Sequence, residues 1–192
     1  MEGRLQGLKL RGETLEGKEF ENCTFVSCDL AEARLSRCRF LGCELRSSEL
    51  SLLKPAGSAF RDVRFVDCRL LGVDWTEVDA ALGLRLAFER CVLDSSSFMA
   101  LHLEELRMVD CTARELGFEG AVLTGATFSS TNLEGSRFHG TDLRGADLSD
   151  ATGVAFDPSA NRLGRTRLSL EGGLAVLGVA GIVIPQLEEG DE

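Results

Sequence analysis

The side chains that could bind a metal ion or act as nucleophiles are seven cysteines and two histidines. Strong zinc motifs hold two cysteines in a Cys-x-x-Cys pair, and this sequence contains no such pair. Within each half of the chain the cysteines are instead separated by multiples of five residues: Cys23, Cys28, Cys38, Cys43 and Cys68, then Cys91 and Cys111. His102 and His139 belong to different turns of the repeat described below, so they do not share a metal. We therefore expect neither a metal site nor a cofactor.

Catalytic motifs are also missing from the sequence. It has no Gly-x-Ser-x-Gly elbow, no phosphate-binding loop and no dinucleotide-binding fingerprint. Acidic pairs such as Glu104–Glu105 are more typical of solvated surfaces than of acid–base catalysis. The composition predicts a protein that acts by binding rather than an enzyme.

The cysteine spacing belongs to a wider repeat, in which a large apolar residue recurs at nearly every fifth position. The first series comprises Leu15, Phe20, Phe25, Leu30, Leu35, Phe40, Leu45, Leu50, Phe60, Phe65, Leu70 and Trp75. The second comprises Phe88, Leu93, Phe98, Leu103, Met108, Phe118, Leu123, Phe128, Leu133, Phe138, Leu143 and Leu148. The residue two places earlier is usually small. Because a period of five fits neither the helix period of about 3.6 nor the strand period of 2, it indicates a repeating coil.

A chain that turns a corner every five residues closes a square after four repeats, so residues twenty apart stack above one another. Residues twenty positions apart, here called a column, are often of the same type, as this stacking requires. Examples are Phe20, Phe40 and Phe60, and Leu103, Leu123 and Leu143. We predict an all-β coil of square cross-section over residues 1–168. Its large and small repeat positions face inward, so the cysteines are predicted to be free, buried thiols in a reducing compartment.

The two series are out of phase. Trp75 and Phe88 are thirteen residues apart, so the coil carries an insertion of either three or eight residues. With eight, Phe88 follows Phe60 in its column and a cysteine column also continues, whereas with three we expect both columns to break. We therefore predict that residues 78–85 are extruded as a loop. Both a tolerated surface insertion and a contact loop on a rigid scaffold are compatible with this sequence.

Residues 169–192 depart from the repeat. Ser169 is a candidate N-cap for a helix that ends near Gly178, and residues 179–184 are predicted to form a short strand before Pro185 and an acidic tail. The apolar run is shorter than the roughly 20 residues that cross a bilayer, so no membrane association is expected. A cap this apolar predicts a homodimer. Its predicted interface residues are Leu170, Leu174, Leu177, Ile182 and Ile184.

The formal net charge is −10, from 31 acidic and 21 basic residues. Direct nucleic-acid binding is disfavoured, because it depends on basic patches. B-DNA carries about 20 charges over a rod of roughly 35 Å, so the net charge of this chain gives about half that density. Partial imitation of nucleic acid and simple solubility are both compatible with this charge. The chain opens without the apolar core of a signal peptide, and we expect a cytoplasmic protein.

The sequences Ala-Asp-Leu-Ser-Asp (146–150) and Thr-Asp-Leu-Arg-Gly (141–145) resemble the repeats of the pentapeptide-repeat family. That resemblance implies a right-handed quadrilateral β-helix. Residues 60–75 and 88–91, the cysteine-rich small positions and the Ile-Val-Ile ending resemble the gyrase-protecting group of this family, which includes albicidin-resistance, Qnr and mycobacterial proteins. Members of this group are cytoplasmic homodimers that resemble B-DNA and protect DNA gyrase from drugs trapping its cleaved complex. The second, longer loop of the plasmid-type Qnr proteins has no counterpart here.

The resemblance implies an antibiotic-resistance protein that binds gyrase as an acidic dimeric rod and counters a poison such as albicidin. The loop would then reach the enzyme, with Asp74, Glu77 and Asp79 as its acidic contacts. The full set of predicted contact residues is Asp74, Glu77, Val78, Asp79, Leu82, Leu84 and Arg85. The alternative is a structural adaptor whose outer faces bind some other protein, with no role at gyrase.

Overall fold

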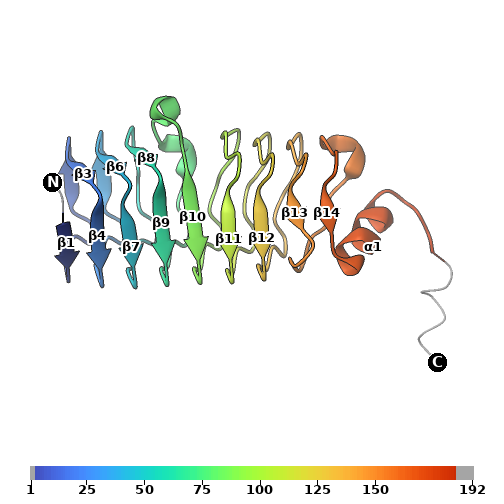
Figure 1. Ribbon diagram of the computed structural model, residues 1–192, viewed down its shortest axis with the longest axis horizontal. Helices are drawn as coiled ribbons and strands as arrows, with labels where there is room; N and C mark the ends of the chain where they lie inside the picture. The colour runs from blue at the N-terminus through green and yellow to red at the C-terminus, as the bar shows by residue number, and fades with distance from the viewer. Residues whose placement is uncertain (1–2, 185–192) are drawn as a thin grey trace.

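The computed structural model describes residues 3–184, and it shows a straight rod of stacked rectangular coils (Figure 1). Every ladder is parallel, and most successive partners are twenty residues apart, as in Leu5↔Phe25 and Phe25↔Leu45. The predicted square coil is therefore confirmed as a parallel β-helix. Its nine-stranded sheet implies roughly eight turns, or a coil roughly 38 Å long at the usual strand spacing of about 4.8 Å.

Three sheets line the coil. The nine-stranded sheet, here called the front face, comprises β1 (Gly3–Gln6), β4 (Cys23–Val26), β7 (Glu44–Arg46), β9 (Val63–Val66), β10 (Leu86–Glu89), β11 (Arg107–Val109), β12 (Thr127–Ser129), β13 (Asp147–Leu148) and β14 (Arg167–Leu168). The other two sheets pair β2 (Thr14–Glu16) with β5 (Arg34–Ser36), and β3 (Glu19–Glu21) with β6 (Arg39–Leu41) and β8 (Ala59–Arg61). The face that carries β3, β6 and β8 is called the loop face.

Stacked rings form the core. Phe40 lies 4.9 Å from Phe60, ring centroid to ring centroid, with an interplanar angle of 5°. Phe118 lies 5.4 Å from both Phe98 and Phe138 in the same parallel manner. From Phe20 to Leu148 the inward positions except Val78 are buried, as the twenty-residue columns predict, whereas Leu15 in the first coil is half-buried. This continuous apolar core holds the faces in fixed register over the length of the rod.

The predicted length of the extruded loop is wrong: three extra residues, not eight, enter the coil between Trp75 and Phe88. The register aligns Phe88 with Phe65, and the two rings stack at 5.1 Å. Trp75 in turn stacks on Phe98 at 5.9 Å. Phe88 therefore follows Phe65 on the front face and does not follow Phe60 on the loop face.

The backbone explains why the shorter insertion is preferred. The N–H of Asp79 donates to the carbonyl oxygen of Ser58 at 2.9 Å, and the N–H of Arg85 donates to that of Phe60 at 3.3 Å. Both ends of the segment thus remain in the ladder, and Leu84 is buried in the core. Extruding all eight residues would forfeit these contacts and leave a side of the coil unfilled. The segment that takes up the three extra residues contains two 3-10 turns, η1 (Trp75–Glu77) and η2 (Ala80–Leu82).

The seven cysteines are buried and unbonded to one another, as the column pattern predicts. The three-residue insertion places Cys68, Cys91 and Cys111 in one column, whereas the eight-residue prediction placed Cys91 above Cys43. The thiol of Cys91 lies 3.4 Å from the carbonyl oxygen of Phe65. The hydrogen bond with Cys111 lowers the pKa of Cys91, but the hydrogen bond with Cys68 and burial outweigh it and raise the pKa to about 12, so Cys91 remains a neutral core thiol at physiological pH.

The last coil ends with η3 (Pro158–Ala160), β14 and the helix α1 (Leu170–Val179). Ser169 caps α1 as predicted, because its hydroxyl oxygen accepts the N–H of Gly172 at 3.0 Å. The predicted end at Gly178 and the predicted strand over 179–184 are wrong. The helix continues through Val179, and Gly181, with φ of +76°, supplies the left-handed residue after it. The predicted acidic tail after Pro185 lies outside the described residues.

Candidate partner-binding surface

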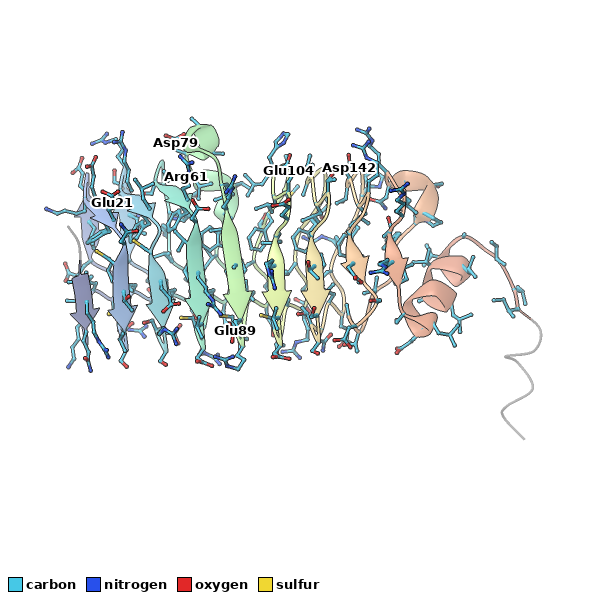
Figure 2. All side chains as sticks on the ribbon, viewed as in Figure 1. Glu21, Arg61, Asp79, Glu89, Glu104 and Asp142 are labelled. Carbon is cyan, nitrogen blue, oxygen red and sulfur yellow. The ribbon has the colours of Figure 1, made fainter. Side chains whose placement is uncertain are left out.

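The three-residue insertion makes the loop face uneven. The segment from Trp75 to Arg85, here called the extension, projects beyond the neighbouring coils next to β10 (Figure 1). It lies over β8, where it buries Ala59, a position whose counterparts Glu19 and Arg39 are exposed. Asp79 points outward from its tip (Figure 2). The extension is therefore a rigidly seated protrusion and not a free loop.

Two of the predicted contact acids hold the extension in shape. Oδ1 of Asp74 accepts the N–H of Thr76, and Oδ1 of Asp79 accepts the N–H of Ala81, each at 3.0 Å. Each carboxylate thereby caps one 3-10 turn, while Asp74, Glu77 and Asp79 all remain exposed. These acids can contribute charge to a partner, and replacing Asp74 or Asp79 would also loosen the extension.

The apolar residues predicted to contact a partner behave differently. Leu84 is only 8% exposed and belongs to the core, so its predicted role as a surface contact is wrong. Val78 is half-buried against the same core, and Leu82 ends η2. Arg85 is exposed, and its guanidinium lies 3.4 Å from Asp62 on the adjacent turn. Among the predicted contacts, the four charged residues are exposed.

The charge of the molecule is unevenly distributed. Residues 3–168 contain 25 acidic and all 21 basic residues, a formal net charge of −4. The remaining six acids lie at positions 2, 171, 188, 189, 191 and 192, outside the coil. The coil therefore has about one fifth of the net charge of B-DNA of similar length, which is roughly 20. The sequence estimate of half that density applied the total charge to the coil alone.

Many charged side chains of the outer surface form ion pairs, some between turns and some within one turn. Arg39 lies 3.0 Å from Glu19, and Arg114 lies 2.5 Å from Asp94, each pair spanning one turn of the coil. Asp142 lies between Arg144, at 2.6 Å, and Arg162, at 3.6 Å. Its hydrogen bond to Arg144 holds the pKa of Asp142 below its usual value. Such a surface presents alternating charges, which favour specific pairing with a protein over a uniform field.

The end of the rod presents apolar side chains. Of the five residues predicted for a dimer interface, Leu170 and Ile182 are exposed and Leu174, Leu177 and Ile184 are half-buried. Val176 instead faces the coil and is buried. Sequence reasoning missed Val179 and Val183, both more than half exposed, since a helix over 170–178 and a strand after it place these residues differently.

The described residues bear on metal binding and on membrane insertion as well. Within residues 3–184 no group of three or more His, Cys, Asp or Glu side chains is arranged to hold a metal ion. His102 lies 3.3 Å from Glu104, a pair that is exposed on the loop face. None of the helices in this range is both long enough and apolar enough to cross a membrane.

Comparison with known protein families agrees with the fold. The family described as "Pentapeptide repeats (8 copies)" matches residues 4–42 and 23–51, and the related "Pentapeptide repeat region" matches residues 84–154. Together the matches cover more than half of the chain, and they leave out residues 52–83, which include most of the extension. A search of curated protein sequences finds no significant match.

Solved structures of the plasmid-mediated fluoroquinolone resistance protein QnrB1 are similar to this chain. A trypsin-treated variant of QnrB1 superposes with a TM-score of 0.70 at 18% identity, covering 95% of this chain and 100% of the other. Full-length QnrB1 superposes with a TM-score of 0.62 at 19% identity, covering 94% and 100%. At this identity the likeness concerns the fold.

Proposed function

Because the chain belongs to the pentapeptide-repeat family, we propose that it is a resistance protein that binds DNA gyrase and protects it from a drug that traps the cleaved complex. The observation that carries this proposal is the likeness to QnrB1 over almost the whole length of both chains. QnrB1 is a fluoroquinolone resistance protein, and the fold it shares with this chain covers 94–95% of the chain. The action proposed is binding and not catalysis.

Shape and local pairing contribute more to the proposed binding than net charge. The coil has a formal net charge of −4 over roughly 38 Å, so it is a weak electrostatic substitute for DNA. It does present rows of carboxylates paired with arginines, and a basic channel of a partner could exchange these pairs for its own. We infer that the rod fills a DNA-binding channel sterically, while exposed acids such as Glu77 and Asp79 orient it.

The extension is the proposed second contact. It is the single interruption of the described coil, and its two turns are fixed by aspartate caps and by Leu84 in the core. A protrusion held this firmly loses little entropy on binding. We propose that Glu77, Asp79 and Arg85, the charged and exposed members of the predicted set, touch the enzyme, with Asp74 capping η1 beneath them.

A homodimer completes the proposal. Leu170 is 82% exposed and Val183 is 66% exposed at the end of the rod. Side chains of this size are rarely left in a group on the surface of a monomer. Two copies joined through α1 and residues 180–184 would form a rod of twice the length with two extensions.

The test is gyrase supercoiling in the presence of a poison and increasing amounts of this protein. We expect recovery of supercoiling with at least one poison of the cleaved complex, and albicidin and a fluoroquinolone should be tried in parallel. The adaptor alternative is favoured by the nearly neutral, ion-paired coil surface, which suits many protein partners. If no poison is countered and gyrase does not bind the protein, the adaptor alternative holds.

A further inference from the structure

A hollow lies on the front face between two arginines. The parallel register aligns Arg64 on β9, Ala87 on β10 and Arg107 on β11, three outward positions on adjacent strands (Figure 1). Alanine is too short to fill its place in this row, so the arginines stand on either side of a cavity of about 340 Å³. Glu89 and Val109 complete its walls.

The two arginines differ in their existing partners. Arg64 pairs with Glu89 and lies 4.0 Å from Glu44. Glu89 is also bound by Arg90, so both of its oxygens are in use. Arg107 has no acidic side chain within 4.0 Å among the described residues. Among the described residues, three other arginines also lack an acidic side chain within 4.0 Å. They are Arg4, Arg34 and Arg165, and they lie nearer the two ends of the coil.

A second, shallower hollow continues from the first toward the extension. It measures about 190 Å³ and is lined by Asp62, Val63, Arg64, Arg85, Leu86 and Ala87. Arg64 and Ala87 belong to both hollows, and Arg85 is the last residue of the extension. The two hollows therefore form one furrow that starts at β11, passes over Ala87 and ends at the base of the extension.

We propose that this furrow binds an acidic segment of a partner protein, with one carboxylate seated over Ala87 against Arg107. A free guanidinium offers a carboxylate two parallel N–H donors, and Arg64 supplies a second cation on the opposite wall. The segment then runs along the furrow toward Arg85. The assignment concerns a surface other than the predicted acidic contacts, and it holds whatever the partner is.

The surroundings favour a protein carboxylate over a nucleic acid. Glu89 and Asp62 line the furrow, and they would repel the continuous row of phosphates in a nucleic-acid strand. A single carboxylate on the Arg107 side of the hollow faces the guanidinium that has no acidic partner, while Glu89 remains paired with Arg64 on the other side. The net charge of −4 on the coil disfavours a polyanion in the same way.

The experiment measures fluorescence anisotropy of a fluorescein-labelled hexapeptide that carries one glutamate among glycine and serine residues, in about 20 mM salt, where exposed charges are weakly screened. We expect saturable binding to the intact protein, and we expect Arg107→Ala to weaken it about fivefold or more. Arg34→Ala removes another arginine that lacks an ion pair, from a different face, and should leave the affinity unchanged. Ala87→Glu places a carboxylate in the hollow and should abolish peptide binding.

Three outcomes would overturn the assignment. The intact protein could fail to bind the peptide, or Arg34→Ala could weaken binding as much as Arg107→Ala, which would indicate general charge attraction. A single-stranded DNA hexamer could bind more tightly than the peptide and depend on Arg107, which would indicate a nucleic-acid site.

Circular dichroism checks folding, and Arg107→Ala carries the test if Ala87→Glu does not fold. Gyrase rescue by Arg107→Ala, measured separately, distinguishes this surface from the proposed function.

Discussion

Phe118 shows what a single ring contributes to this fold. It is fully buried, and its ring stacks on Phe98 and Phe138 at 5.4 Å on either side. We expect Phe118→Ala to cost about 3–5 kcal/mol, because the removed ring leaves a cavity that the two fixed neighbouring turns cannot close. Chemical denaturation followed by circular dichroism measures the loss.

Phe20→Ala is the matched control for that prediction. Phe20 occupies the first turn of its column and has a stacked ring on one side only, that of Phe40. Phe20→Ala should therefore lower the free energy of unfolding clearly less than Phe118→Ala does. A loss below about 1 kcal/mol for Phe118→Ala would contradict the stacked-column account of stability.

Asp142 makes stability depend on pH at the acid end. Its hydrogen bond with Arg144 lowers its pKa below the usual 3.8. Since the folded state has the lower pKa, the ionised carboxylate stabilises the fold above pH 3.8, and this contribution is lost as the pH falls through the folded pKa. We expect Asp142→Asn to melt at a lower temperature than the parent at pH 7, with the difference shrinking below about pH 4.

Asp110→Asn provides the comparison for Asp142→Asn, because it also removes one negative charge, but from an exposed aspartate. It should melt like the parent at every pH. If the two substitutions behave alike, the ion pairs of Asp142 do not stabilise the coil.

At the scale of elements, the sequence predicted the columns but not the phase between its two halves. Phe60 and Phe65 are both phenylalanines, so placing Phe88 above either one continues an aromatic column. Residue types therefore could not distinguish the two insertions. The difference lies in backbone hydrogen bonds at Asp79 and Arg85 and in the burial of Leu84, which the pattern of large residues does not show.

The C-terminal strand was mispredicted for a related reason. The apolar run Val179–Ile184 has strand propensity, but a strand requires a neighbouring backbone. In the described residues no partner strand follows β14, and the helix hydrogen bonds continue instead, with Ala180 N–H donating to Val176 at 3.1 Å. Tertiary context, which the local sequence lacks, decided this element.

Shortening the extension tests its role. Replacing residues 80–84 by Leu-Ala removes the three extra residues and retains a leucine at the inward position. We expect a folded protein whose melting temperature lies within about 5 °C of the parent, because the downstream register is unchanged. If the extension contacts gyrase, this variant should rescue supercoiling less well, and rescue equal to the parent would make the extension a passive insertion.

Deleting residues 78–85 is the informative contrast. It also keeps a five-residue phase, but it rotates every later turn by one face, so that Trp75 would meet Leu103 instead of Phe98. The stacked pairs Trp75–Phe98 and Phe65–Phe88 would be lost. This variant should therefore be much less stable than the shortened one, whereas equal stability would support an eight-residue extrusion.

At the scale of the whole molecule, the proposed dimer concentrates both apolar surface and charge where the coils end. Deleting residues 170–192 removes α1, its exposed apolar side chains and five of the 31 acids. We expect this protein to be a monomer by light scattering and to keep the β-rich spectrum of the coil, since only Gly172 and Val176 of α1 are buried. Deleting residues 186–192 removes four acids but keeps the helix, so this shortened protein should remain a dimer.

A dimer that separates into monomers when residues 186–192 are deleted would assign assembly to the tail. An intact protein that is monomeric at micromolar concentration would leave a single rod as the binding unit, and the doubled length in the gyrase proposal would have to be abandoned.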